Sequence, residues 1–508
     1  MKKFLIILVN TQLFKKYFIG YNIISGGIYD ENKKIAFVAS DCQPFFTSGG
    51  LGDVIGSLPK KIAKLDKGAW EVTVFLPLYS KISKAYANKL VYYGQMYVSL
   101  SWRKQYCGIY KYEEAGVTYY FIDNEYYFKR EKFYGYFDDA ERFAFFSKAV
   151  IDVMLHINEV PDVIHCHDWQ TGLLPVYLRT LYYHHDAFKN VKRIFTIHNI
   201  EYQGKYSNDS DIIEDVFGIH VNDAYLLEYN GCLNIMKGAI ECSNIVSTVS
   251  PSYAEEIKTP EYAHGLEGEI IRAASEGKLC GILNGIDTTF YNPKKDKALF
   301  KNYDKADLST KKENKAELQQ MLGLPVSNVP VIGMVSRLVA HKGLDILKNA
   351  FNDLMQQDIQ LVVIGTGDAY YEGFLKDMEA KYANKVKVIL AFNQDLARKI
   401  YASSDLFLMP SKSEPCGLSQ MIASRYGAIP MVRETGGLKD SIKDFGGKKG
   451  NGYTFAGFEA SSLVDMVRRA VNDYNSENWN ELVEKVMSVD FSWKVSAKSY
   501  VQMYKKVL

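Results

Sequence analysis

Short apolar runs, each followed by a turn and then by a stretch of helical periodicity, recur along most of the 508-residue chain. The first run covers residues 35–40, and a helical stretch with apolar positions at Val54, Leu58 and Ile62 follows at 53–64. Because buried parallel strands are apolar on both faces and alternate with helices, this order predicts a largely parallel sheet covered by helices. We expect further strands of this series at 72–76, 118–122, 163–165, 193–197 and 245–249.

A second series of the same kind follows a polar, charged stretch at 292–297, a composition typical of a domain junction. We therefore predict an α/β protein with two facing, doubly wound, Rossmann-like domains, at 34–290 and 291–488, and an active-site cleft between them. The expected strands of the second domain are 331–335, 361–365, 386–390, 406–409 and 429–432.

The first 33 residues do not fit this pattern. Two lysines precede a six-residue apolar run at 4–9, which Asn10 ends, so the segment resembles the start of a signal peptide. The run is short, no small-residue cleavage pattern follows it, and a membrane span needs about 20 residues. We expect an N-terminal extension of unclear role at 1–33.

Net charge indicates which partners to expect, and cysteine content indicates the compartment. Lysine and arginine total 61 against 59 aspartate and glutamate, a net charge of +2, which disfavours nucleic acid or a membrane surface as the partner. Seven cysteines lie singly along the chain, and none forms a C-x-x-C pair. This pattern is typical of reduced thiols and predicts a cytoplasmic protein.

Candidate chemistry lies where the expected strands end. Gly49 and Gly50 precede a helix that carries Asp53 in its first turn, an arrangement that suits a bound anion or a tight turn without a ligand. In the second domain, Arg337 and Lys342 follow a buried strand. A guanidinium and a mobile ammonium suit a diphosphate, although the pair would also suit a solvated surface.

Two histidine-containing motifs follow successive strands of the first domain. His167 is followed by Asp168 and Trp169, and His198 lies at the next strand end. A zinc site needs three or four protein ligands, and no matching set is evident, so we expect no metal. The side chains either bind a sugar or serve as structural hydrogen-bonding groups.

The last strand ends of the second domain carry Glu414 and a second glycine pair. Glu414 could accept hydrogen bonds from ligand hydroxyls, or it could be a solvated loop carboxylate. Cys416 is a poor nucleophile because the neighbouring carboxylate disfavours the thiolate. No G-x-S-x-G motif is present, so a serine hydrolase is not indicated.

Taken together and in order, these motifs resemble the bacterial glycogen synthase and plant starch synthase family. The resemblance implies a GT-B fold and a retaining transfer of glucose from a nucleoside diphosphate, mostly ADP, to the 4-hydroxyl at the non-reducing end of an α-1,4-glucan. It implies no cofactor, and a helix at 489–508 that returns to the first domain. The motifs are SGGLGDV, DDAERFAFF, HCHDWQTGL, TIHNIEYQG, STVSPSYAEEI, GILNGID, SRLVAHKGLD, EPCGLSQ and ETGGLKD.

The resemblance also implies roles for single residues. Arg337 and Lys342 would hold the donor diphosphate, Glu414 the glucose hydroxyls, and the Gly49–Gly50 loop the distal phosphate. The glucose and the reacting centre would be lined by His167, Asp138 and Asn284. Further substrate contacts are expected at Thr47, Asp53, Cys416, Gly417, Leu418, Thr435, Gly436 and Gly437.

Two departures from the family pattern bear on donor binding. Thr47 stands where the family usually has a lysine that approaches the donor phosphates, and Ser413 stands where a bulky residue is common. The missing lysine favours one alternative function, a catalytically weak homologue that binds glucan or regulates a synthase. A sucrose or trehalose-phosphate synthase is disfavoured, because HCHDWQTGL and EPCGLSQ follow the glucan synthase pattern.

Overall fold

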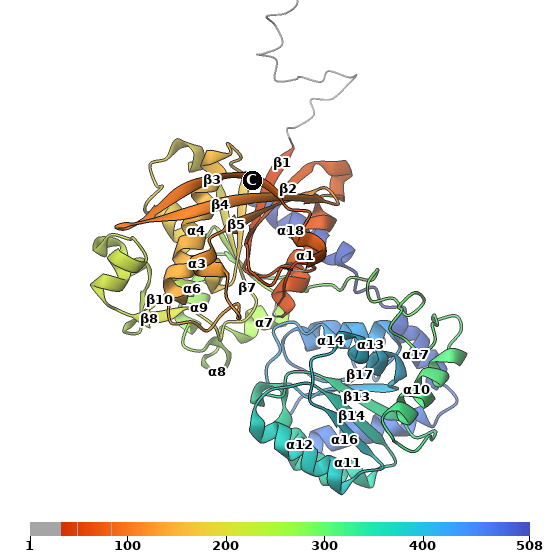
Figure 1. Ribbon diagram of the computed structural model, residues 1–508. Helices are drawn as coiled ribbons and strands as arrows, with labels where there is room; N and C mark the ends of the chain where they lie inside the picture. Colours follow the sequence, from red (N-terminus) through yellow and green to blue (C-terminus); the bar gives the residue numbers. More distant parts are fainter. Residues whose placement is uncertain (1–31, 48, 83) are drawn as a thin grey trace, which may run out of the picture.

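The computed structural model describes residues 32–508, apart from residues 48 and 83, so most of the extension expected at 1–33 lies outside the described residues. Two α/β bodies lie next to each other, each built around its own sheet (Figure 1). This architecture confirms the predicted fold class. The division of the chain at 290 and 291 stays a prediction.

The first body contains a nine-stranded sheet in the order β12-β11-β7-β6-β1-β2-β5-β4-β3. From β12 to β5 all neighbours are parallel, and β4 and β3 continue the edge as antiparallel strands. The strands are β1 (Lys33–Val38), β2 (Trp70–Pro77), β3 (Val91–Leu100), β4 (Arg103–Glu114), β5 (Val117–Asp123), β6 (Val163–His167), β7 (Lys192–Ile197), β11 (Ile245–Thr248) and β12 (Leu279–Gly281).

Sequence reasoning missed β3, β4 and β12. β3 is an edge strand with much of its length exposed, so its residues do not form the continuous apolar run of a buried parallel strand. A small sheet of β8 (Lys205–Ser207), β10 (Cys232–Asn234) and β9 (Glu228–Tyr229) was also missed. The α-helices that follow or cover the strands of this body are α1 (Gly50–Ile62), α2 (Lys84–Ala87), α3 (Glu125–Phe128), α4 (Asp139–His156), α5 (Leu173–Arg179), α6 (Ile235–Cys242), α7 (Pro251–Glu256), α8 (Pro260–Ala263) and α9 (Glu267–Ser275).

The second body contains a six-stranded, fully parallel sheet in the order β15-β14-β13-β16-β17-β18. Five of its strands match the expected runs, and the three-residue β18 was missed. The strands are β13 (Val331–Val335), β14 (Gln360–Ile364), β15 (Val386–Ile389), β16 (Leu406–Met409), β17 (Ile429–Arg433) and β18 (Tyr453–Phe455). The helices are α10 (Ser309–Met321), α11 (Leu344–Gln356), α12 (Ala369–Lys381), α13 (Gln394–Ser403), α14 (Ser419–Arg425), α15 (Gly436–Ser441), α16 (Ala460–Tyr474) and α17 (Trp479–Met487).

The chain returns to the first body in its last helix, α18 (Trp493–Lys505), which packs against α1 (Figure 1). The segment that leads into the second body and the segment that returns from it touch each other through backbone atoms. The amide of Ile286 donates to the carbonyl of Phe491 at 2.8 Å. A Cβ atom at Gly285 would lie 2.7 Å from the amide nitrogen of Trp493 and 2.9 Å from the carbonyl oxygen of Phe491. Glycine is therefore required here for the two segments to pack.

We predict that Gly285→Ala destabilises the protein, because the added methyl group forces two backbone segments apart at a cost of about 1–3 kcal/mol. Gly373→Ala is the matched control, since Gly373 lies inside α12 with nothing within 4 Å of its Cβ position. There the change should be neutral or stabilising by up to about 1 kcal/mol. Thermal unfolding of both variants tests this prediction. Equal unfolding midpoints for the two would contradict the close approach at Gly285.

Candidate active site

In each sheet there is one place where successive strands start to be added on the opposite side of the first strand. The candidate residues lie at these places. In the first sheet this place lies between β1 and β6, and in the second between β13 and β16. Ligands of open α/β sheets bind beyond the carboxyl ends of the strands at such switch points. His167 is the last residue of β6, Arg337 follows β13, and Glu414 follows β16.

Three histidines form a cluster at the first switch point: His165 and His167 are buried, and His198 is partly buried. His167 Nδ1 lies 2.9 Å from His198 Nε2, and the rings of His165 and His167 are 4.1 Å apart between centroids. Burial lowers the pKa of His198 to about 3 and holds the pKa values of His165 and His167 well below the usual range. All three imidazoles are therefore neutral at physiological pH.

His165 lies in a hydrogen-bond chain that crosses three strands. Its Nδ1 is 2.9 Å from the hydroxyl of Tyr504 on α18, and its Nε2 is 2.6 Å from the hydroxyl of Thr196. The Thr196 hydroxyl is in turn 2.5 Å from that of Ser247 on β11. His165 is thus fully engaged as a structural residue. In contrast, His167 Nε2 is buried and has no hydrogen-bond partner among the described residues.

Asp168 holds the turn after β6. Its backbone has φ 56° and ψ 174°, a strained conformation that is otherwise adopted almost only by glycine. The carboxylate accepts hydrogen bonds from the amides of His198 at 2.8 Å and Asn199 at 3.4 Å. Burial raises its pKa to about 7. Asp168 therefore links the two histidine-bearing strand ends rather than facing a ligand.

At the second switch point, the partly buried Lys342 and the buried Glu414 form an ion pair. The ammonium lies 2.9 and 2.7 Å from the two carboxylate oxygens, and the hydroxyl of Ser411 donates to one of them at 3.1 Å. The backbone of Gly343, at φ 79°, packs against the carbonyl of Pro410, which brings the turn that carries Lys342 close to the strand end of β16. Arg337 is exposed and makes no ion pair with any residue in the described part of the chain.

Asn284 and Cys416 meet at the junction of the two bodies. Asn284 is buried, and the hydroxyl of Tyr500 on α18 lies 3.5 Å from its side-chain oxygen. Burial raises the pKa of the Cys416 thiol to about 12. The thiol is a poor nucleophile, as predicted, but burial is a larger cause than the neighbouring Glu414. Gln420 donates to the carbonyls of Cys416 and Gly417 at 3.1 and 2.9 Å and so supports the loop before Leu418.

The Thr435–Gly437 turn has protein partners for its donors. The Thr435 hydroxyl and the Gly436 amide donate to Glu256 of the first body at 3.0 and 2.8 Å. The Gly437 amide donates to the carbonyl of Glu414 at 3.1 Å. The direct substrate contacts expected at these three residues stay a prediction, although the structure shows each donor in use within the protein.

The glycine loop before α1 is open. Gly49 and Gly50 are exposed, with nothing within 4 Å of their Cβ positions. The Thr47 hydroxyl donates to the carbonyl of Gly49 at 3.1 Å, and its side chain packs against Gly52, where a Cβ atom would collide with it. In the first turn of α1, burial and then the nearby carboxylate of Asp287 raise the pKa of Asp53 to about 7.

Asp138 caps the start of α4 and pairs with Arg130, whose nitrogens lie 2.5 and 2.6 Å from its carboxylate. Burial opposes ionisation, but the Arg130 guanidinium outweighs it and the pKa of Asp138 is lowered. The adjacent Asp139 is buried and pairs with Arg142 inside the first body. Of the two carboxylates, only that of Asp138 is partly exposed enough to reach a ligand.

Comparison with known proteins identifies the family. Residues 34–272 match the family model of the starch synthase catalytic domain, and residues 320–485 match that of group 1 glycosyl transferases. A glycogen synthase from Clostridium botulinum is 48% identical over 93% of this chain and 99% of its own length. A second from Geobacillus stearothermophilus is 45% identical over 94% and 98%.

The chain belongs to the glycogen and starch synthase family.

Two solved structures agree with the fold. The catalytic domain of starch synthase IV from Arabidopsis thaliana, bound to ADP and acarbose, superposes with a TM-score of 0.84 at 34% identity, covering 94% of this chain and 99% of that one. A sucrose-phosphate synthase from Thermosynechococcus elongatus superposes with a TM-score of 0.59 at 16% identity, which shows a shared fold only. The protein is therefore a glycosyltransferase with the GT-B fold, and its family uses a nucleotide-sugar donor and a glucan acceptor.

Two further observations concern the described residues alone. The described residues contain no helix that is both long and apolar enough to cross a membrane. Nor do three or more His, Cys, Asp or Glu side chains gather among them in a metal-binding arrangement.

Sequence reasoning missed several residues that support the site: Ser250, Glu256, Tyr500 and Tyr504. The first two lie in the STVSPSYAEEI motif, which carried part of the family resemblance but had no assigned role. Tyr500 and Tyr504 are four residues apart and therefore share one face of α18, so their spacing was a usable signal.

We predict that His198 makes the protein acid-sensitive. The pKa of His198 is about 3 in the folded protein and 6.5 ordinarily, so below pH 6.5 the unfolded chain binds a proton that the folded protein does not. Stability is then lost as the pH falls, by up to about 1.4 kcal/mol per pH unit. His198→Gln should show a shallower decline of the thermal midpoint between pH 7 and 5 than wild type. His184→Gln, at an exposed position, is the control, and parallel curves for His198→Gln and wild type would contradict the prediction.

Proposed function

We propose that this enzyme transfers glucose from ADP-glucose to the non-reducing-end 4-hydroxyl of an α-1,4-glucan, with retention of configuration. The observation that carries the proposal is that candidate groups stand at the switch points of both sheets and that the two bodies make contact beside Glu414. One presents the neutral His167 and the open Gly49–Gly50 loop, and the other presents Arg337 with the Lys342–Glu414 pair. The ADP bound by the Arabidopsis starch synthase supports ADP as the nucleotide.

Arg337 and Lys342 hold the donor diphosphate in this proposal. Arg337 is exposed and can present its fork of donors to phosphate oxygens. Lys342 is neutralised by Glu414 in this structure, and the diphosphate offers it a second anionic partner. Glu414 then uses its carboxylate oxygens to accept hydrogen bonds from the glucose hydroxyls. The ion pair thus holds both side chains in place before the donor binds.

His167 serves as an uncharged hydrogen-bonding group toward the glucose. Its Nδ1 is engaged by His198, and the buried Nε2 remains for a sugar hydroxyl. A neutral imidazole avoids placing a second cation beside the oxocarbenium-like centre that develops at C1. Asp138 and Asn284 complete the lining of the reacting centre, with the Asp138 carboxylate facing that positive charge.

The reaction needs no protein nucleophile. The bond between C1 of glucose and the diphosphate oxygen breaks, and the acceptor 4-hydroxyl oxygen bonds to C1 on the same face. The proton of that hydroxyl passes to the leaving diphosphate oxygen, so charge and atoms balance. Arg337 and Lys342 stabilise the negative charge that grows on the diphosphate, which is the largest contribution the side chains can make.

The remaining candidates surround the phosphates. The Gly49–Gly50 loop, with Thr47 and Asp53 beside it, closes on the distal phosphate. On the opposite side, the backbone of Cys416, Gly417 and Leu418 leads into α14. The lining of the donor site on the side of Glu414 is completed by Thr435, Gly436 and Gly437. The donor is a substrate and no cofactor takes part. We place the reaction in the cytoplasm, where nucleotide sugars are made and where the seven unpaired cysteines stay reduced.

We predict that Arg337→Ala, Lys342→Ala and Glu414→Ala each lower kcat with ADP-glucose and glycogen about a hundredfold or more, because each removes a contact that strengthens in the transition state. Release of ADP at saturating substrate measures the rate. Lys312→Ala, an exposed lysine of α10, is the control for loss of one positive charge. Circular dichroism checks that each variant folds.

Near-native rates in both Arg337→Ala and Lys342→Ala would remove the assigned phosphate site. Background rates in the wild-type protein with both ADP-glucose and UDP-glucose would favour the alternative, a glucan-binding or regulatory homologue. The Thr47 departure favours that alternative, and retention of Arg337, Lys342, His167 and Glu414 favours catalysis.

We predict that Thr47→Lys improves donor use by up to about tenfold, equivalent to about 1.4 kcal/mol from one added charge contact. The open space around Gly49 and Gly50 leaves room for the longer side chain to reach the phosphates. Initial rates at several ADP-glucose concentrations, with Thr47→Ala alongside, measure the effect. A large loss in both variants would show that Thr47 itself makes a needed contact.

A further inference from the structure

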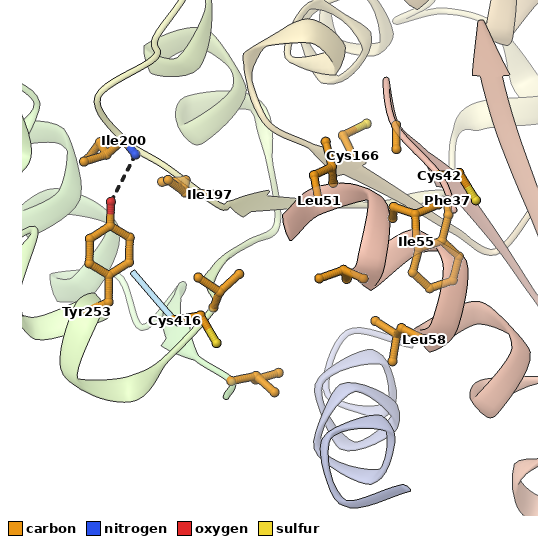
Figure 2. Packing of buried hydrophobic residues seen from close by; sticks show 14 of the residues in the cluster. Phe37, Cys42, Leu51, Ile55, Leu58, Cys166, Ile197, Ile200, Tyr253 and Cys416 are labelled. Carbon is orange, nitrogen blue, oxygen red and sulfur yellow. Dashed lines mark hydrogen bonds between the residues drawn. The ribbon is translucent and has the colours of Figure 1, made fainter. Parts of the chain in front are cut away.

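Helix α7 of the first body packs against α15 of the second. Figure 1 shows α7 where the two bodies meet. The helix follows β11 directly, and Ser250 caps its start by accepting from the amide of Tyr253. Tyr253 is buried, and its hydroxyl accepts from the amide of Ile200 at 3.0 Å, as Figure 2 shows. α7 is therefore anchored in the first body at the strand ends of β7 and β11.

Three sets of hydrogen bonds join α7 to the second body. The Ser250 hydroxyl donates to the carbonyl of Pro415 at 2.6 Å. The amide and hydroxyl of Ser252 both donate to the Asp440 carboxylate at 2.7 Å. At the end of the helix, Glu256 accepts from the Thr435 hydroxyl and the Gly436 amide.

The Glu256 contact differs from that of Ser252 because it continues into the backbone of Glu414. The Ser250 contact reaches the same loop at the adjacent carbonyl of Pro415. The Gly437 amide donates to the Glu414 carbonyl at 3.1 Å. Gly436, at φ 43°, lies so close to the same carbonyl that a methyl group would collide with it. The turn that Glu256 holds is therefore also the turn on which the Glu414 backbone rests.

Glu256 also has a feature that a simple structural contact does not require. Its second carboxylate oxygen is buried and has no hydrogen-bond partner among the residues described. A buried polar atom without a partner lowers stability, so a residue that keeps one needs an explanation beyond stability.

We propose that Glu256 is a positioning residue for the transfer: it fixes the Thr435–Gly437 turn, and through that turn the Glu414 backbone, relative to the first body. The inference rests on the role proposed above for Glu414. The glucose lies between groups from both bodies, and a misplacement of about 1 Å can cost about a hundredfold in rate. The Glu256 carboxylate spans the junction and supports the Glu414 backbone, so it is placed to prevent such a misplacement.

The test compares Glu256→Ala with Glu256→Gln and Asp440→Ala. Glu256→Ala should lower kcat at least tenfold while the KM for ADP-glucose changes less than threefold. Glu256→Gln should recover most of the rate, because its amide oxygen can still accept from Thr435 and Gly436. Asp440→Ala removes a neighbouring contact between the bodies that does not support Glu414, and it should change kcat less than threefold.

Equal kcat losses in Glu256→Ala and Asp440→Ala would overturn the proposal, because they would mean that any contact across the junction has the same effect. A loss confined to KM would overturn it too. Thermal unfolding verifies the fold of each variant, and if Glu256→Ala does not fold, Glu256→Asp carries the same comparison.

A double variant separates this inference from the role of Glu414. If Glu256 acts through Glu414, Glu256→Ala should slow the Glu414→Ala enzyme little further, whereas multiplying effects would overturn the proposal. Near-native activity of Glu414→Ala alone would instead refute the assigned role of Glu414, which is a distinct outcome.

Discussion

The proposed site draws groups from two α/β bodies, and such a site requires that the bodies be held in a fixed relative position. The chain crosses from one body to the other and back, and at Gly285 the two crossing segments touch through backbone atoms alone. Asn284, the neighbouring residue, contacts Tyr500 on the returning helix. The junction thus depends on a position where no side chain fits. The contacts of α7 with the second body add a second line of attachment on the side of the cleft where Glu414 lies.

The two halves of the site are electrostatically different. The first body contributes histidines that burial keeps neutral, and the second contributes Arg337 and the Lys342–Glu414 pair. Burying an ion pair costs desolvation energy that its own attraction does not always repay, so its value here lies in keeping both charges ready for a donor. Neutral groups near the sugar carbon and cations near the diphosphate match the charge separation that develops as the bond to the leaving group breaks.

The sequence predicted the parallel strands and the strand-end residues well, because a continuous apolar run and a polar residue after it are local signals. It missed β3, whose exposed edge position hides the apolar run, its antiparallel neighbour β4, most of which is only partly buried, and β18, which has three residues. It also missed the partners of the site. Nothing near His165 in the chain indicates Tyr504, and nothing near Thr435 indicates Glu256, because these contacts arise only when distant segments fold together. The role of Thr47 at its turn depends in the same way on its packing against Gly52.

The contact between Tyr504 and His165 joins residues 339 positions apart in the chain. The ribosome makes the first sheet long before it makes α18. Until then the surface of α1 that α18 covers is exposed, and His165 lacks Tyr504, one of its two hydrogen-bond partners. Contacts of such long sequence separation are slow to form, and exposed apolar surface in the interval favours aggregation. The first body, although it is synthesised first, is therefore complete only after the last helix has been made.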